Sequence, residues 1–362
     1  MIETLQRGLT ATFTAVAILA VGVSHAEEAP KVVASIKPLH SLVAGVMDGV
    51  GEPTLIIDGL SSPHGFSLKP SHVAAMNEAD AVFWIGQALE TSLDRPIDTL
   101  PDTVRRVALI EAQGMQLLRF REEADFEGHD HDHADHGHDD HDHDEHADEG
   151  HAHEGQGHGD HAHDEHAHDD HAHDDHAHKE HGHDDHALSQ FDPHVWLDPR
   201  NAVVMVREIA ATLSQVDPNH AETYRRNAAD MTDRLNALVE NVHAQLADAK
   251  GVPYAVFHDA YQYFEHRFEL TAVGSVTVNP ETPPSAERVR EIQDKLKRLN
   301  VACIFTEPQF SEKVVKVAAE GSSAGVGQLD PHGVDAPAGP NHYFATIESL
   351  ANSIATCLAA NS

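Results

Sequence analysis

The chain has 362 residues and a formal net charge of −36, and its length accommodates two domains of ordinary size. Residues 129–186 hold 21 acidic residues and one lysine, so this segment carries −20 of the charge and the remaining residues carry −16. This acidic balance excludes nucleic acid as a partner, because nucleic-acid binding requires a basic face.

The first 26 residues are predicted to be a secretory signal peptide. Arg7 lies in a short charged region, residues 10–23 are apolar or small, and Ser-His-Ala at 24–26 has the pattern of a cleavage site. The alternative is a membrane anchor, but the apolar run is too short to span a bilayer. Cleavage at this site would start the mature chain near Glu27, and export would place it in the periplasm. No cysteine follows the apolar run, so no lipid anchor is expected there.

Up to the middle of the chain, short apolar stretches alternate with helical patterns. Strands are predicted where apolar runs are bounded by turn residues, and helices where Pro38 and Ser71 supply start signals. The predicted strands are 31–35, 54–57, 81–85 and 107–110, and the predicted helices are 38–46 and 71–77.

Residues 129–186 contain 22 of the 33 histidines, and from His161 onward a five-residue unit of the form His-Ala-His-Asp-Glu repeats. No packed core can form from this composition, so a disordered loop is predicted over about residues 121–190. Its imidazoles and carboxylates are metal ligands at high local density. The segment therefore indicates a metal protein, in which the loop collects metal weakly or senses its abundance.

After the insert, a helix is predicted over 199–216. Between 220 and 249, apolar residues recur at Leu235, Leu238, Val242 and Leu246, which predicts one long helix, with a break near Thr232 as the alternative. The remaining predicted strands are 253–257, 270–278, 301–305 and 325–329, and the remaining predicted helices are 260–268, 285–299, 311–320 and 343–358.

The alternation of strands and helices predicts an α/β fold with two lobes, each with a mainly parallel sheet flanked by helices, joined by one long helix. The N-terminal lobe is expected to span 27–217 and to contain the disordered loop, the linking helix 218–249, and the C-terminal lobe 250–362.

Four polar residues come after predicted strands or directly after the insert. His64 and His194 belong to the first half of the chain, and His258 and Asp330 to the second. Ligands bind at the carboxyl ends of parallel strands, so loops from the two halves are expected to bring these side chains together across a cleft. Three imidazoles and one oxygen match a tetrahedral zinc site.

The two cysteines, Cys303 and Cys357, are expected to form one disulfide in an oxidising compartment, joining a strand to the C-terminal helix. Two buried free thiols are the alternative.

The motifs around these residues resemble those of the zinc-specific solute-binding proteins of bacterial ABC importers, the ZnuA type of the cluster 9 metal receptors. The resemblance extends from residue 31 to residue 358, and includes a His-rich acidic loop and a cysteine pair spaced as here. The motifs that carry it are Ser35-Ile-Lys-Pro-Leu39, Pro63-His-Gly-Phe-Ser-Leu-Lys-Pro-Ser71, Asp192-Pro-His-Val-Trp-Leu-Asp-Pro199, Phe257-His-Asp-Ala-Tyr-Gln-Tyr-Phe264, Glu307-Pro-Gln309 and Leu329-Asp-Pro331.

The resemblance implies that His64, His194 and His258 are the zinc ligands. The fourth ligand in such proteins is a water, a Glu before the first histidine or the Asp of the Leu-Asp-Pro motif. Here Pro63 precedes His64, which leaves Asp330 or a water, and we predict Asp330. Three histidines with at most one carboxylate suit zinc, whereas manganese favours more oxygen ligands.

The resemblance also implies a function: a monomeric periplasmic receptor that captures Zn²⁺ between its lobes and delivers it to an ABC permease in the inner membrane. One alternative is a periplasmic zinc buffer or chaperone without a transporter. Another is a three-histidine zinc lyase or hydrolase, but the chain has neither a His-Glu-x-x-His motif nor a nucleophile elbow, so no enzyme is predicted.

Overall fold

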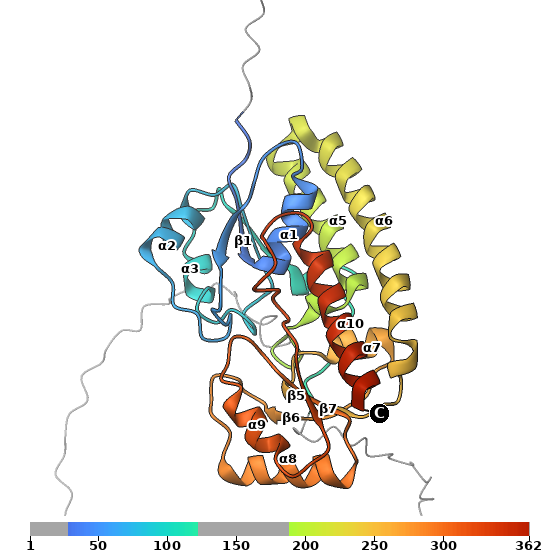
Figure 1. The fold of residues 1–362 in the computed structure, drawn as a ribbon. Helices are drawn as coiled ribbons and strands as arrows, with labels where there is room; N and C mark the ends of the chain where they lie inside the picture. Colours follow the sequence, from blue (N-terminus) through green and yellow to red (C-terminus); the bar gives the residue numbers. More distant parts are fainter. Residues whose placement is uncertain (1–27, 122–187, 362) are drawn as a thin grey trace, which may run out of the picture.

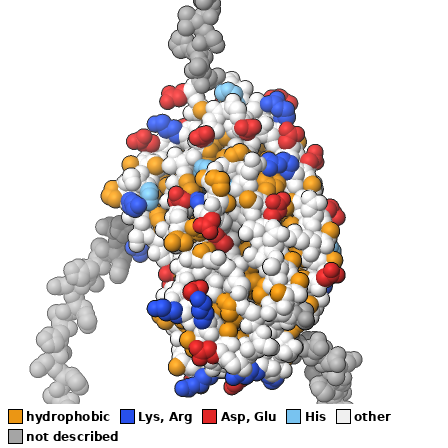
Figure 2. All heavy atoms as spheres, in the orientation of Figure 1, with side chains coloured by type: hydrophobic (Ala, Val, Ile, Leu, Met, Phe, Trp, Pro, Cys, Tyr) orange, Lys and Arg blue, Asp and Glu red, His pale blue; other side chains and the backbone are white. Residues whose placement is uncertain are grey.

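The computed structural model describes residues 28–121 and 188–361, which form two α/β halves stacked on one another (Figure 1). The predicted signal peptide and nearly all of the predicted loop lie outside the described residues. On the face drawn in Figure 2, basic and acidic side chains are interspersed over both halves. Within the described ranges no helix is both long enough and apolar enough to cross a membrane.

The first half is built on a four-stranded parallel sheet in the order β2-β1-β3-β4. All five residues of β1 are buried, as expected for a central strand covered on both faces. Helices α1, α5 and α6 lie on one side of this sheet, and α2 and α3 on the other (Figure 1). The strands are β1 Val32–Ile36, β2 Thr54–Ile57, β3 Ala81–Trp84 and β4 Arg105–Ala108.

The prediction for the fourth strand was wrong by two residues. Arg105 and Arg106, which the apolar pattern missed, pair with Ala81 and Val82 of β3, and residues 109–111 form a 3₁₀ turn instead of extending the strand. Because β4 is an edge strand, its exposed arginines meet solvent and no apolar run is required there.

The second half repeats this plan with a parallel sheet in the order β6-β5-β7-β8. Along β5, Tyr254 and Val256 face the main core, whereas Ala255 and Phe257 face a second apolar cluster beneath α8 and α9. This alternation follows from the two-residue period of a strand. The strands are β5 Tyr254–His258, β6 Ala272–Thr277, β7 Cys303–Thr306 and β8 Gly325–Gln328.

Two long helices, α6 and α10, pack on each other, and α10 contacts elements of both halves. Helix α6 continues through Thr232 without a break and packs on α5, α1 and α10. Helix α10 contacts α1 at one end and the strands β7 and β8 at the other (Figure 1). The helices are α1 Lys37–Val46, α2 Pro70–Asn77, α3 Asp94–Asp98, α5 Pro199–Val216, α6 Ala221–Gln245, α7 Gln262–Phe268, α8 Ala286–Arg298, α9 Lys313–Ala319 and α10 His342–Asn361.

Both sheets reverse their strand order beside the first strand of each half, between β1 and β3 and between β5 and β7. In open parallel sheets, ligands bind outside the carboxyl ends of the strands at such a reversal. His258 ends β5, Glu307 directly follows β7, and Lys37 directly follows β1. The topology therefore places these polar residues at the ligand-binding edges.

The predicted disulfide between Cys303 and Cys357 is confirmed, with 6.3 Å between the Cα atoms. It joins the first residue of β7 to α10, at the end of the strand opposite the ligand-binding edge.

Replacing both cysteines by serine is expected to lower the free energy of unfolding by about 2–4 kcal/mol, because a disulfide chiefly restricts the unfolded chain. Denaturant titration of the oxidised wild type and the double variant measures this. Metal affinity should stay unchanged, and a large loss of affinity would show that the disulfide acts on the site.

Candidate metal site

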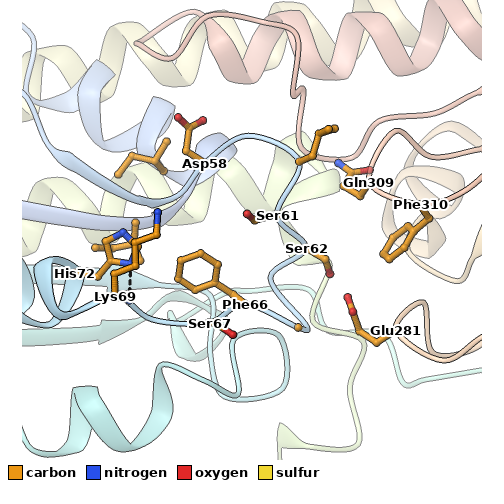
Figure 3. Close-up of a pocket in the computed structure, with 14 residues that line it drawn as sticks. Asp58, Ser61, Ser62, Phe66, Ser67, Lys69, His72, Glu281, Gln309 and Phe310 are labelled. Atoms are coloured by element: carbon orange, nitrogen blue, oxygen red, sulfur yellow. Dashed lines mark hydrogen bonds between the residues drawn. The ribbon is translucent and has the colours of Figure 1, made fainter.

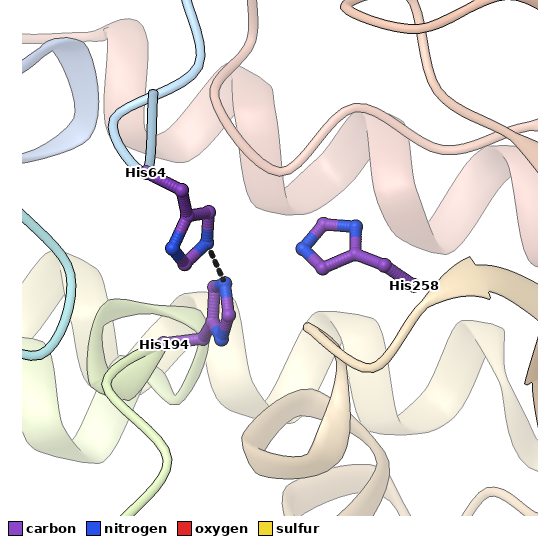
Figure 4. Close-up of side chains that lie close together, drawn as sticks. All are labelled: His64, His194 and His258. Atoms are coloured by element: carbon purple, nitrogen blue, oxygen red, sulfur yellow. Dashed lines mark hydrogen bonds between the residues drawn. The ribbon is translucent and has the colours of Figure 1, made fainter. Parts of the chain in front are cut away.

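Three histidines from separate parts of the chain converge to form the only cluster of metal-ligand side chains detected in the described ranges. One ligand atom each from His64, His194 and His258 lies within 4.8 Å of the other two. The ring centroids are 5.2 Å apart for His64 and His194, 5.3 Å for His194 and His258, and 6.0 Å for His64 and His258. Figure 4 shows His258 facing the other two rings from the opposite half.

His258 is held by a carboxylate behind the ring. Its Nδ1 lies 2.6 Å from Oε1 of the buried Glu307, which follows β7 across the strand reversal. A carboxylate at this position fixes the proton on Nδ1, so that Nε2 keeps its lone pair. That Nε2 is buried and has no hydrogen-bond partner among the described residues, as expected of an atom that awaits a metal ion.

His194 has the same kind of support. Its Nδ1 lies 2.7 Å from Oδ1 of Asp192, which also accepts the backbone N–H of His194 at 2.9 Å. His194 directly follows the insert in the sequence, and within the described residues no named strand leads into it. It precedes a 3₁₀ turn, Val195–Leu197, just after an isolated bridge between Arg119 and Phe191. The contacts of Asp192 with the backbone and the ring of His194 hold this turn.

His64 is the least supported of the three. It lies on the segment between β2 and α2, is only half-buried, and its Nε2 lies 3.2 Å from Nε2 of His194. Among the hydrogen bonds of the described residues, that contact is the only one its ring makes. Burial, together with the nearby His194 and His258 rings, lowers the pKa of His64 to about 2, so the ring is neutral and able to bind a metal.

Asp330 lies outside the three-histidine cluster. Its Oδ1 accepts hydrogen bonds from Gln309 Nε2 and from the backbone N–H groups of His332 and Gly333, at 3.0–3.1 Å. Its Oδ2 accepts the backbone N–H of Val334 at 2.6 Å. The carboxylate thus organises the turn after β8, which favours the water alternative for the fourth ligand.

The charged groups beside the histidines pair with each other across the two halves. Arg121 contacts Oδ1 of Asp259 at 3.0 Å and also Oε2 of Glu265. Arg267 holds both oxygens of Asp198 at 2.7 Å. These pairs fix the His194 turn against β5 and α7, and they engage Asp259 and Glu265, the two acidic residues nearest His258 in sequence.

Two supporting residues were missed by the sequence analysis. Glu307 could have been found by the rule that identified His258, since it too is polar and directly follows a strand. Asp192 stands in the quoted Asp-Pro-His motif, but nothing in the sequence showed that its side chain turns back onto the histidine two residues later.

A pocket of about 560 Å³ opens beside the histidine cluster (Figure 3). Ser62 and Gly65, which flank His64, line one side, and Glu281, Gln309 and Phe310 line the other. Residues of both halves therefore line a pocket next to the segment that carries His64.

The fold and the three converging imidazoles define a metal-binding solute receptor. The chain belongs to the ZnuA family, whose profile is described as zinc-uptake complex component A, periplasmic, and matches residues 32–357. Members of this family are receptors and not enzymes, which confirms the prediction of no catalytic activity and excludes the hydrolase alternative.

Relatives support this assignment over nearly the whole chain. The chain is 47% identical to the high-affinity zinc uptake system protein ZnuA of Brucella abortus (strain 2308), covering 97% of this chain and 99% of that protein. It is 40% identical to the protein of the same name from Haemophilus influenzae, covering 91% and 93% of the two chains.

Solved structures share the fold at lower identity. A crystal structure of a ZnuA matches with a TM-score of 0.65 at 21% identity, covering 91% of this chain and 98% of that one. FpvC of Pseudomonas aeruginosa, solved with Mn²⁺, matches with a TM-score of 0.66 at 18% identity, covering 92% and 100%.

Substitution of Asp330 by Asn tests whether Asp330 binds zinc or only organises the turn after β8. We expect a loss of about 1.5–3 kcal/mol in stability, because the amide nitrogen cannot accept the N–H of Val334. Zinc affinity should fall by at most about tenfold. Thermal unfolding and calorimetric titration measure both quantities, and a loss of affinity as large as that of His258→Ala would make Asp330 a ligand.

Proposed function

We propose that this protein is a periplasmic high-affinity zinc receptor, which captures Zn²⁺ between its two halves and delivers it to an ABC permease. The observation that carries the proposal is the convergence of His64, His194 and His258, with the Nδ1 atoms of His194 and His258 facing buried carboxylates. Such supported imidazoles are preorganised to present Nε2 to a metal ion.

Zinc fits this donor set better than a harder ion. Three neutral nitrogen donors suit zinc, with Zn–N distances of about 2.0–2.1 Å, whereas Mn²⁺ prefers oxygen. The relatives named as zinc uptake proteins support the same metal. With Asp330 engaged in its turn, a water is the proposed fourth ligand, and zinc is the cargo and not a resident cofactor.

The architecture supports delivery with small relative motion of the halves. Helix α10 packs on α1 of the first half and on β7 and β8 of the second, and the Arg121 and Arg267 ion pairs cross between the halves. These restraints support limited closure, in which local changes around His64 admit the ion, and we propose that the receptor acts as a monomer. Export by the predicted signal peptide would place it in the periplasm, where the inner-membrane permease takes the ion.

The His-rich segment 129–186 is assigned an accessory role: it collects zinc weakly at many sites and passes it to the three histidines. Because its composition predicts no packed core, its imidazoles are expected not to be preorganised, and each of its sites should bind more weakly than the cluster.

Calorimetric titration tests the assignment. The full chain is expected to show one tight zinc site plus weaker multiple binding, and a chain lacking 129–186 should keep only the tight site. His194→Ala and His258→Ala should weaken the tight site by more than about 100-fold, because even the groups behind metal ligands contribute about 10–100-fold. His243→Ala, a surface histidine paired with Glu269, is the matched control and should change nothing.

Loss of the tight site on deletion of 129–186 would contradict the assignment. The transport role is tested by growth under zinc limitation. A deletion strain should grow poorly and recover with excess zinc, whereas equal growth would favour a buffer without a transporter.

Zinc affinity is expected to fall on acidification, with His258 protonating first. Burial lowers the pKa of His258, but the carboxylates of Glu307, Asp259 and Asp192 outweigh this effect and raise it. Since Nδ1 already faces Glu307, the added proton goes to Nε2, the atom that must bind zinc. Affinity should therefore be full above the pKa of His258 and decline as the pH falls through it.

Titrations over about pH 5 to 8 measure this decline. Glu307→Gln should move its onset to lower pH, because the main group that raises the pKa is lost. An affinity that is constant over this range would contradict the assignment of His258 as a ligand.

A further inference from the structure

The Ser35-Ile-Lys-Pro-Leu39 motif contributes no side chain to the histidine cluster, but its lysine contacts residues of both halves. Lys37 is the first residue of α1, at the carboxyl end of β1, and its side chain is only 11% exposed. Its Nζ donates to the backbone carbonyls of Val334 at 3.0 Å and Ala336 at 3.4 Å, and lies 3.3 Å from Oδ1 of Asp58. The three donors of the ammonium thus meet three acceptors.

One partner of Lys37, Asp58, is the first residue of the segment that carries His64. This segment runs from the end of β2 to the start of α2 and forms one wall of the pocket in Figure 3, where Asp58, Ser61 and Ser62 follow one another. Asp58 also accepts the backbone N–H of Gly59 at 2.7 Å, which fixes the first turn of the segment.

The other partners belong to a firmly held turn of the second half. Asp330 caps the backbone N–H groups of residues 332–334, Trp196 Nε1 donates to the carbonyl of Pro331 at 3.0 Å, and a ring nitrogen of His342 lies 2.8 Å from the carbonyl of His332. Residues 330–336 therefore form a rigid turn, and Lys37 links Asp58 to this turn.

We infer that Lys37 is a positioning residue for His64, which sets the third metal ligand through Asp58 and the 330–336 turn of the other half. His194 and His258 have their own carboxylates, whereas the only hydrogen bond of the His64 ring within the described residues goes to another ring, that of His194. The place of His64 is thus determined by its segment. This inference rests on the proposed zinc-binding function.

The contacts of Lys37 should contribute little to the stability of the fold, which distinguishes a role in positioning His64 from a general role in folding. Asp58 is 67% exposed, so its ion pair contributes little to stability. The carbonyls of Val334 and Ala336 belong to partly exposed residues and can bind water instead. Loss of Lys37 should therefore affect the geometry of the third ligand more than the stability of the fold.

The test is a double-mutant cycle on the full chain, with zinc as the ligand. Lys37→Met, which keeps the apolar stem, should weaken zinc binding about tenfold, mainly through faster dissociation. In a His64→Ala background, Lys37→Met should have almost no further effect, because the residue it positions is absent. Asp58→Asn, which perturbs the same junction from its exposed side, should reproduce the loss even if Lys37→Met folds poorly.

Lys31→Met is the matched control, since Lys31 pairs with Glu78 on the surface of the same half, and it should leave zinc binding unchanged. Equal losses from Lys37→Met with and without His64, or unchanged affinity in both Lys37→Met and Asp58→Asn, would overturn the inference. Failure of the proposed function would be seen separately, as wild-type protein whose zinc binding does not depend on His194.

Discussion

The hydrogen bond between a buried carboxylate and the Nδ1 of a histidine is the interaction on which the site depends. Asp192 and Glu307 each use one oxygen to orient a ring, at 2.7 and 2.6 Å, and so direct two Nε2 atoms toward the same point from opposite halves of the molecule. Without these carboxylates, buried imidazoles could rotate or change tautomer, and the geometry that favours a small tetrahedral ion would be lost.

The proposed site also requires the two halves to be held firmly together. Two ligands that come from different halves share a metal only if the halves keep a fixed separation. The ion pairs of Arg121 and Arg267, helix α10 and the main apolar core all join the two halves. In the proposed site, the molecule thus combines a rigid pair of ligands, His194 and His258, with a third, His64, on a segment that Lys37 restrains through Asp58.

Much of this arrangement could be predicted from the sequence, because apolar runs and helix start signals are local. Strand Thr54–Ile57 and helix Pro199–Val216 were predicted to the residue. The three histidines were found because residues at the carboxyl ends of parallel strands meet, and because their motifs resemble a known family. The edge strand at Arg105 and Arg106 was placed wrongly, since an exposed edge needs no apolar run.

What the sequence could not supply were contacts between residues far apart in the chain. Glu307 lies 49 residues from His258, and Lys37 lies 297 residues from Val334. The hydrogen bonds that engage Asp330 in its own turn were also invisible, because Leu-Asp-Pro reads equally well as a ligand or as a capping turn.

The most direct test of the account is the crystal structure of the zinc-loaded protein, with anomalous scattering recorded at the zinc edge. We expect one strong peak about 2.0–2.1 Å from the Nε2 atoms of His64, His194 and His258, with the Nδ1 atoms of His194 and His258 still bonded to Asp192 and Glu307. A dominant peak elsewhere, or coordination through Nδ1 of either supported histidine, would contradict it.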